Sequence, residues 1–294
     1  MNNEQLERMS HGTGFIAALD QSGGSTPGAL TRYGIPRESY SDEEMPTLIH
    51  EMRSRIITNP RFSSEHILAA ILFEDTVDRE IEGIGSARYL WEKKHIVPFL
   101  KTDKGLAEEA NGVQLMKPMS DFNMFIDKGL QKGVFGTKMR SVIHLANPTG
   151  IAAVVDQQFE FGEQILKAGL VPILEPEVDV KSSEKEAAES LLRDSLASHL
   201  DQLGHDDMVI LKLTLPEQND LYVPLMKHRN VIRVAALSGG YSREESTERL
   251  ARNHGMIASF SRALTEGLEV TMSDDEFTAA LERSIEQIYE ASIT

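Results

Sequence analysis

Short apolar segments of strand length alternate with amphipathic segments along the whole chain. The strand candidates are rich in β-branched residues and lie at residues 15–20, 67–74, 96–101, 134–139, 170–175, 207–213, 231–237 and 256–260. Apolar residues recur with helical spacing in segments between and after them, such as residues 42–58, 151–168, 184–203, 243–253 and 274–291. Strands that alternate with helices form right-handed βαβ units, so the strands are predicted to be parallel.

Eight such units without a break in composition predict a closed (β/α)8 barrel of the TIM type, which is an α/β fold. An open, doubly wound sheet has the same alternation and is the competing interpretation. No Pro/Gly/Ser-rich linker or repeat divides the chain, so residues 1–294 are expected to form a single domain. Three serines are followed three residues later by glutamate near the start of a predicted helix, which predicts capping boxes at Ser41–Glu44, Ser183–Glu186 and Ser273–Glu276.

The composition excludes several classes of function. The chain has 46 acidic and 30 basic residues and a formal net charge of −16, which disfavours nucleic acid and anionic membranes as main partners. It has no cysteine, so disulfides, thiolate metal sites and cysteine nucleophiles are excluded. The first residues are polar and no apolar run has the length of a membrane span, so a cytoplasmic location is expected.

Charged side chains lie at the ends of most predicted strands, where barrel enzymes carry their active sites. These strand-end residues are Asp20, Glu74, Lys101, Lys138, Arg140, Glu175, Glu177, Lys212 and Arg262. Because side chains alternate between the two faces of a strand, Lys138 shares a face with Arg140, and Glu175 shares one with Glu177. If these pairs point inward, the barrel mouth holds a basic cluster beside carboxylates, and an anionic substrate is expected.

Lys212 lies within the apolar run 208–213 and is the strongest candidate for a nucleophile. Burial and neighbouring cations lower the pKa of a lysine in general and leave some neutral amine to attack a ketone carbon and form a Schiff base. The alternative is a lysine that extends to solvent from the strand end or pairs with a carboxylate. Glu175 and Glu177, two carboxylates on one face with a proline between them, are predicted to serve as acid and base, with a structural salt bridge or a cap as the alternative. Asp20 is a further candidate, with a turn or cap role as the alternative.

Ser238, Gly239, Gly240 and Arg262 follow predicted strands seven and eight, where barrels often bind phosphate. A plain tight turn is the alternative. No GxGxxG motif follows the first strand and no P-loop occurs, so a dinucleotide fold is not supported. None of the nine histidines ends a predicted strand and no HExxH occurs, so neither a metal nor another cofactor is predicted.

The same strand-end segments resemble those of the class I, Schiff-base-forming fructose-bisphosphate aldolases, specifically their shorter bacterial form. The similar segments follow the family order and lie at residues 14–25 (GFIAALDQSGGS), 71–74 (ILFE), 99–105 (FLKTDKG), 136–140 (GTKMR), 169–177 (GLVPILEPE), 211–213 (LKL), 237–240 (LSGG) and 260–264 (FSRAL). The resemblance implies a single barrel that reversibly cleaves fructose 1,6-bisphosphate into dihydroxyacetone phosphate and glyceraldehyde 3-phosphate without a metal or cofactor. A homo-oligomer is compatible with it.

By this resemblance Lys212 matches the Schiff-base lysine and Glu175 the principal acid/base, with Glu177, Lys138 and Asp20 as supporting groups. Residues that match the phosphate site of the aldehyde half are Ser22, Ser25, Lys101 and Arg140. Residues that match the site for the dihydroxyacetone phosphate end are Ser238, Gly239, Gly240 and Arg262.

The chain departs from the long eukaryotic members in two places. Those members have a C-terminal tail whose terminal tyrosine assists proton exchange on the enamine, whereas Tyr289 here falls inside the last predicted helix. Leu213 follows Lys212 where the animal enzymes have proline. Three alternatives remain: a Schiff-base or transaldolase-like enzyme for another phosphorylated ketose such as tagatose 1,6-bisphosphate, a metal-dependent aldolase, and a non-catalytic phosphosugar-binding protein.

Overall fold

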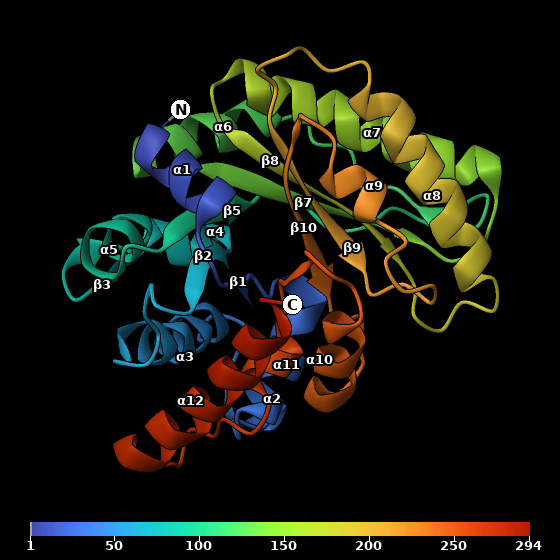
Figure 1. Cartoon of the computed structure of the whole chain (residues 1–294). Coiled ribbons are helices and arrows are strands. Elements are labelled where there is room, and N and C mark those ends of the chain that lie inside the picture. The colour runs from blue at the N-terminus through green and yellow to red at the C-terminus, as the bar shows by residue number, and fades with distance from the viewer. Residues whose placement is uncertain (1) are drawn as a thin grey trace.

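The computed structural model describes residues 2–294 and contains a nearly closed barrel of parallel strands with helices around it (Figure 1). In barrel order the strands are β1 (Phe15–Leu19), β2 (Ile67–Leu72), β5 (Val97–Lys101), β7 (Gly136–Ile143), β8 (Val171–Val178), β9 (Val209–Thr214), β10 (Val231–Leu237) and β11 (Ile257–Ala258). The last strand meets the first through a hydrogen bond from Ala18 N to Phe260 O (3.2 Å). The predicted (β/α)8 barrel is therefore confirmed, and the open-sheet alternative is wrong.

Helices cover the outside of the barrel, with α7 and α8 packed together over one side (Figure 1). The helices are α1 (Asn3–His11), α2 (Thr26–Arg32), α3 (Met45–Thr58), α4 (Glu74–Asp78), α5 (Ser86–Lys94), α6 (Phe122–Lys132), α7 (Pro148–Lys167), α8 (Lys185–Leu200), α9 (Val223–Met226), α10 (Arg243–Ala251), α11 (Arg262–Thr265) and α12 (Asp274–Ala291). Short additional strands are β3 (Glu80–Ile81), β4 (Ile84–Gly85) and β6 (Val113–Gln114). The five helices predicted from the sequence correspond to α3, α7, α8, α10 and α12.

Helix α1 covers the N-terminal end of the barrel. Its Arg8 donates from Nη2 to Ser64 O (2.6 Å) and Ile67 O (3.0 Å), just before and at the start of β2. Arg233 of β10 donates from Nε to Met9 O (2.7 Å), and the Met9 side chain is fully buried against the residues inside the barrel. This end is therefore filled by apolar packing, which leaves the C-terminal ends of the strands as the place for a polar cavity.

Several strand limits differ from the prediction. β7 and β8 run beyond residues 134–139 and 170–175 because they pair with each other over eight residues, from Gly136↔Val171 to Ile143↔Val178. His144 consequently follows a strand end directly, so the prediction that no histidine does so is wrong. β2 ends at Leu72, not at Glu74, because Glu74 begins α4 and forms an ion pair with Lys128 of α6.

The capping-box predictions have mixed outcomes. The box at Ser273 and Glu276 is confirmed at the start of α12. Ser41 and Glu44 exchange the same hydrogen bonds, although the continuous helix α3 begins one residue after Glu44. The box at residues 183 and 186 is wrong, because Ser182 accepts from Glu184 N (3.2 Å) and α8 starts without a side-chain cap.

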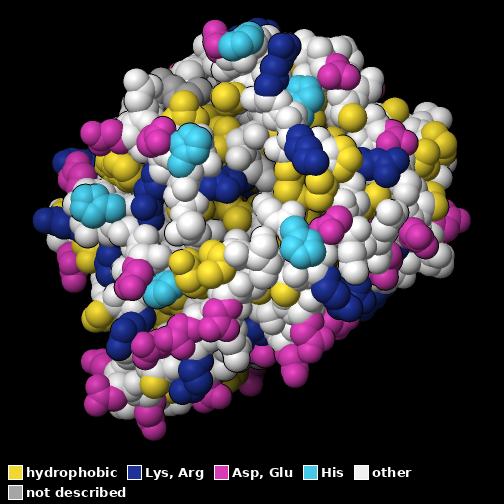
Figure 2. Space-filling view, viewed as in Figure 1, with side chains coloured by type: hydrophobic (Ala, Val, Ile, Leu, Met, Phe, Trp, Pro, Cys, Tyr) yellow, Lys and Arg dark blue, Asp and Glu magenta, His cyan; other side chains and the backbone are white. Residues whose placement is uncertain are grey.

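Acidic side chains gather along the lower edge of the face in Figure 2, where α12 lies in Figure 1. This helix begins with Asp274, Asp275 and Glu276, so its first turn carries the charge that complements a helix dipole. Within residues 2–294, no helix is both long and apolar enough to cross a membrane. That the whole chain forms one domain stays a prediction.

Candidate active site

A cavity of about 610 Å³ lies at the C-terminal ends of the barrel strands. It brings together twelve of the thirteen residues predicted from the sequence, namely Asp20, Ser22, Ser25, Lys101, Lys138, Arg140, Glu175, Glu177, Lys212, Ser238, Gly239 and Arg262. The predicted Gly240 is not in the cavity wall, but it lies against Arg262: a Cβ built on Gly240 would be 3.2 Å from Nη2 of that arginine. Residues from seven strands or their following loops therefore converge on one place.

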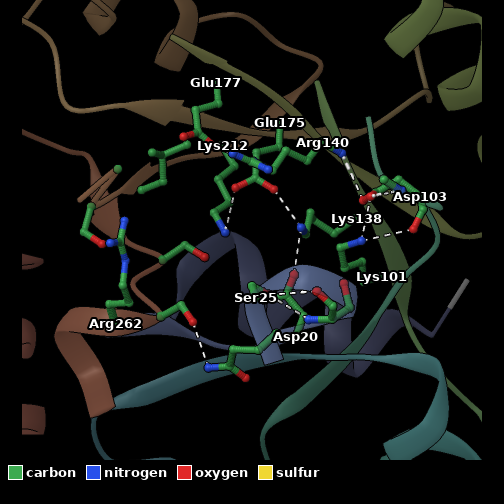
Figure 3. Close-up of a pocket in the computed structure, with 18 of the residues that line it drawn as sticks. Asp20, Ser25, Lys101, Asp103, Lys138, Arg140, Glu175, Glu177, Lys212 and Arg262 are labelled. Carbon is green, nitrogen blue, oxygen red and sulfur yellow. Dashed lines mark hydrogen bonds and ion pairs between the residues drawn. The ribbon is translucent and has the colours of Figure 1, made fainter. Parts of the chain in front are cut away.

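Two lysines and two carboxylates form a continuous chain of ion pairs on the cavity floor (Figure 3). Lys138 Nζ lies 2.7 Å from Asp20 Oδ2 and 2.8 Å from Glu175 Oε2. The other oxygen of Glu175, Oε1, lies 3.0 Å from Lys212 Nζ. Each of these four side chains is buried. The Glu175 carboxylate thus bridges the two lysines and can exchange a proton with anything bound to Lys212.

The charges in this chain determine which groups are ionised. Burial alone would raise the pKa of Glu175, but the positive charges of Lys138 and Lys212 lower it. The same competition holds the pKa of Asp20 well below its usual range, again mainly through Lys138. Burial alone would lower the pKa of Lys138, and the charges of Asp20 and Glu175 raise it well above the ordinary value. Lys138 is consequently a fixed cation between two ionised carboxylates.

Two further ion pairs line the wall of the cavity. Arg140 Nε donates to Glu177 Oε2, and both side chains line the cavity together with Lys138 and Glu175, as the alternation along each strand predicted. Lys101 Nζ donates to Asp103 Oδ1 (2.6 Å) and to Asp103 O (3.0 Å). Asp103 also accepts from Arg140 N (3.2 Å), so it holds the ends of β5 and β7 together. Asp103 was not among the predicted site residues, although it stands two positions after Lys101 at a strand end.

Positive charge exceeds negative charge in the cavity wall. Six cationic side chains and four carboxylates line it, an excess of two positive charges on a chain with a net charge of −16. The two cations that form no ion pair with any of residues 2–294 are Arg32 and Arg262. Burial and, after it, the charge of Arg262 lower the pKa of Arg32. Arg32 belongs to the short helix α2 and was missed by the sequence analysis. The surplus charge suits an anionic ligand.

The loop after β10 depends on glycine. Gly239 has φ = +59°, and a Cβ built there would lie 2.5 Å from Val180 Cγ1 in the loop after β8. A side chain at this position would therefore both strain the backbone and collide with Val180. On the other side of the cavity, Ser25 Oγ donates to Ser22 O (2.9 Å) and accepts from Ser22 N (3.0 Å), which closes a turn after β1.

The C-terminal residues lie away from the cavity. The Tyr289 ring stacks edge-on against the ring of His66, with centroids 4.5 Å apart, and His66 directly precedes β2. Thr294 O accepts from Gly255 N (3.1 Å), shortly before β11 begins. Both contacts are at the N-terminal ends of strands, whereas the cavity is at the C-terminal ends. No tyrosine or histidine among residues 2–294 lines the cavity.

Fold and cavity together define a barrel protein with a buried, carboxylate-paired lysine on its sixth strand. Over 294 residues the chain is 60% identical to the class 1 fructose-bisphosphate aldolase of Synechocystis sp., and the match covers 100% of this chain and 98% of that protein. It is 56% identical over 295 residues to the class 1 fructose-bisphosphate aldolase of Clostridium acetobutylicum, with 100% of both chains covered. No protein-family model matches the chain. The identities show that it belongs to the class 1 fructose-bisphosphate aldolase family.

A solved structure supports the fold independently of these identities. The structure of fructose-bisphosphate aldolase from Plasmodium falciparum, in complex with TRAP and a small-molecule inhibitor, is similar with a TM-score of 0.73 at 19% identity. The similarity covers 98% of this chain and 91% of that chain. The barrel architecture is thus common to both chains.

Proposed function

We propose that the protein catalyses the reversible cleavage of fructose 1,6-bisphosphate into dihydroxyacetone phosphate and glyceraldehyde 3-phosphate through a Schiff base on Lys212. The observation that carries this proposal is the buried Lys212 amine, 3.0 Å from the Glu175 carboxylate, on the floor of a cavity with surplus positive charge. The high identity to the class 1 fructose-bisphosphate aldolases of Synechocystis sp. and Clostridium acetobutylicum supports the same reaction.

In the first half of the reaction, the Lys212 amine attacks the C2 ketone of the open-chain sugar and forms a carbinolamine. Glu175 shuttles the proton that the amine gives up to the departing hydroxyl group, which leaves as water. The product is an iminium ion whose positive charge draws electrons from the C3–C4 bond. Glu175 suits this task because its Oε1 is within hydrogen-bond distance of the amine that reacts.

In the second half, a carboxylate, Glu175 or Asp20, takes the proton from the C4 hydroxyl as the C3–C4 bond breaks. The aldehyde product leaves, and the electrons of the broken bond form an enamine on Lys212. Protonation of the enamine at C3 and hydrolysis then release dihydroxyacetone phosphate and regenerate the amine. Lys138, which is a fixed cation beside both carboxylates, stabilises the negative charge that develops on the C4 oxygen.

The two phosphates of the sugar are proposed to bind at opposite sides of the cavity. Figure 3 shows Arg262 on one side and Lys101 on the other, with the lysine–carboxylate chain between them. Ser238, Gly239, Gly240 and Arg262 would hold the dihydroxyacetone phosphate end, while Ser22, Ser25, Lys101 and Arg140 would hold the aldehyde end. A bisphosphate uses both groups of residues, which favours it over a ketose with one phosphate.

The cellular setting follows from the same proposal. A phosphorylated sugar is the expected partner, and the net charge of −16 disfavours nucleic acid. No apolar helix of membrane length occurs in residues 2–294, and the cytoplasm, where phosphosugars are metabolised, is the proposed location. The reaction as written uses no metal ion, so activity should persist in a chelator.

Borohydride trapping tests the chemistry directly. The protein is incubated with dihydroxyacetone phosphate in EDTA and reduced, and the added mass is mapped by peptide mass spectrometry. The expected result is one adduct on Lys212. Lys185 is a matched internal control, because it is also 4% exposed and ion-paired but lies outside the cavity. Activity that disappears in EDTA, without any adduct on Lys212, would contradict the Schiff-base mechanism and favour a metal-dependent one.

A further inference from the structure

Arg53 of α3 is a fully buried arginine that forms no ion pair with any carboxylate of residues 2–294. Burial lowers its pKa to about 10, which still leaves the guanidinium charged near neutral pH. Its Nη1 donates to Thr76 Oγ1 (2.7 Å) and its Nη2 donates to the main-chain oxygen of Gln21. A buried charge without an acid is costly, so its hydrogen bonds point to a positioning role.

Gln21 connects two loops of the cavity. It stands between Asp20 and Ser22 after β1, and its side chain is buried. Arg53 donates to the main-chain oxygen of Gln21 and, more weakly, to its side-chain Oε1 (3.4 Å). The Gln21 Nε2 donates to Ser261 Oγ (2.9 Å). Ser261 directly precedes Arg262 in the loop after β11. The side chain of Gln21 therefore bridges the loop with the turn Ser22–Ser25 and the loop with Arg262.

This bridge lies at the barrel seam with the fewest main-chain contacts. Every other neighbouring pair of barrel strands forms a parallel ladder, but β11 has only two residues and no ladder with β1. Across this seam, one main-chain hydrogen bond runs from Ala18 N of β1 to the main-chain oxygen of Phe260, two residues after the end of β11 (3.2 Å). At the level of the cavity, the distance between the two loops therefore depends on the bond between Gln21 and Ser261.

We propose that Gln21, held by Arg53 and bonded to Ser261, is a positioning residue that sets the distance between the two phosphate-binding sides of the cavity. This inference rests on the proposed function, in which the loop after β1 serves the aldehyde end and Arg262 serves the other end. A bisphosphate bound at both ends depends on their separation. A ketose with a phosphate at C1 alone binds through the Arg262 side only, so its affinity does not depend on this separation. The bond between Gln21 and Ser261 is therefore expected to increase the affinity for the bisphosphate relative to such a ketose.

The test compares fructose 1,6-bisphosphate with fructose 1-phosphate in three variants. Gln21→Met keeps the shape of the side chain but removes its amide, Ser261→Ala removes the acceptor, and the third variant combines both. Ser261→Ala is expected to raise KM for the bisphosphate about five- to tenfold, the effect of one lost hydrogen bond. Gln21→Met should raise it at least as much, because it also removes the longer bond from Arg53 Nη2 to Gln21 Oε1 (3.4 Å). KM for fructose 1-phosphate and kcat for both sugars should stay close to wild type. The double variant should be no worse than the more affected single variant, because both changes break the same bond.

Thr278→Ala is the matched control. It removes a side-chain hydrogen bond of similar length, from Asn59 Nδ2 to Thr278 Oγ1 (2.8 Å), which links the end of α3 to α12 outside the cavity. This variant should lower the melting temperature as much as Ser261→Ala does, yet leave both KM values unchanged. If the bond between Gln21 and Ser261 contributed only to stability, Ser261→Ala would leave both KM values unchanged, as Thr278→Ala does.

Three results would overturn the inference while leaving the proposed function intact: an unchanged preference between the two sugars in both single variants, an equal loss with both sugars, or additive losses in the double variant. If Gln21→Met does not fold, the KM values of Ser261→Ala for the two sugars decide whether the inference holds. A wild-type protein that cleaves neither sugar would overturn the proposed function and this inference together.

Discussion

Two lysines in this protein are equally buried and both are paired with glutamate, but their surroundings differ. Lys185, at the start of α8, donates from Nζ to Leu215 O (2.8 Å) and lies 2.6 Å from Glu189 Oε1 and 3.0 Å from Glu217 Oε1. Lys185 Nζ therefore has three oxygen neighbours within 3.0 Å. Lys212 Nζ has one ion-pair partner, Glu175, and lines the cavity. Burial alone therefore does not distinguish the proposed nucleophile from a structural lysine; the two differ in that the Lys212 side chain lines the cavity and the Lys185 side chain does not.

The carboxylates beside the two lysines differ in the same way. Burial raises the pKa of Glu189, and the charge of Lys185 offsets this shift only in part. The pKa of Glu175 is lowered despite its burial, because Lys138 and Lys212 both act on it. Glu189 also accepts from Glu217 N (2.9 Å), which fixes the loop after β9 on α8. The Lys185 cluster thus fastens a loop, whereas the Lys212 cluster faces a space where a ligand fits.

Replacing each lysine gives the largest expected contrast. Lys212→Ala should lower kcat by on the order of 10⁴-fold or more, because the proposed Schiff base forms on this amine, while the melting temperature stays near wild type. Lys185→Met should keep kcat close to wild type but lower the free energy of unfolding by about 3–5 kcal/mol, since Glu189 remains buried without its cation. Steady-state cleavage rates and thermal unfolding measure both. Substantial turnover in Lys212→Ala would remove this lysine from the mechanism.

The paired glutamates sharpen the comparison. Glu175→Gln should lower kcat by about 10²- to 10⁴-fold, the usual contribution of a general acid–base group. Glu189→Gln should lower the melting temperature and leave kcat near wild type, because this residue does not line the cavity. The measurement is kcat at saturating fructose 1,6-bisphosphate, with thermal unfolding in parallel. Comparable losses of kcat in both variants would mean that the cavity does not separate the two clusters functionally.

Replacing Arg262, which has no ion-pair partner among residues 2–294, should change KM more than kcat. Arg262→Ala is expected to raise KM for the bisphosphate roughly 10- to 100-fold, the effect of losing one or two charged hydrogen bonds. Arg88→Ala removes the same charge from the exposed ion pair with Glu92 and should leave KM unchanged. Initial rates across a range of substrate concentrations distinguish the two. A KM in Arg262→Ala equal to that of Arg88→Ala would place the phosphate elsewhere.

The smallest effect is expected in the pH dependence of stability. The folded state holds the pKa of Asp20 below the value of about 3.9 in an unfolded chain. The contribution of the ionised Asp20 to the free energy of unfolding is therefore complete above that pH and is lost as the pH falls. The difference in melting temperature between wild type and Asp20→Asn should therefore be largest near pH 6–7 and shrink below about pH 4. Thermal unfolding from pH 3 to 7 measures it. A difference that grows on acidification would contradict the assigned charge state of Asp20.

Much of the cavity was predictable because parallel strands have a simple geometry. The carboxyl ends of barrel strands meet at one rim, so Asp20, Lys138, Glu175 and Lys212 could be expected together although they are far apart in the sequence. Period-two alternation predicted that Lys138 shares a face with Arg140 and Glu175 with Glu177, and all four side chains line the cavity. The strand limits were less predictable, because the length of β7 and β8 depends on how far the two strands pair with each other.

Side-chain partners outside the strands were not predictable. Arg32 belongs to a seven-residue helix that contains Pro27 and Gly28, too short to show a helical period, so nothing in the sequence placed it near Arg262. The hydrogen bond from Gln21 to Ser261 joins residues 240 positions apart across the barrel seam. Such a contact exists only once the first and last strands have met.

The sequence by itself determined the order of strands and helices, the rim at which the charged residues collect, and the buried position of Lys212 inside an apolar run. These properties are local, since they depend on side-chain periodicity and on the residues that end each strand. The tertiary structure decided which acid neutralises which cation, which cations remain unpaired, and that Lys185, in the polar segment 181–187, is as buried as Lys212. Those outcomes depend on distances between separate elements, which packing sets after the local structure has formed.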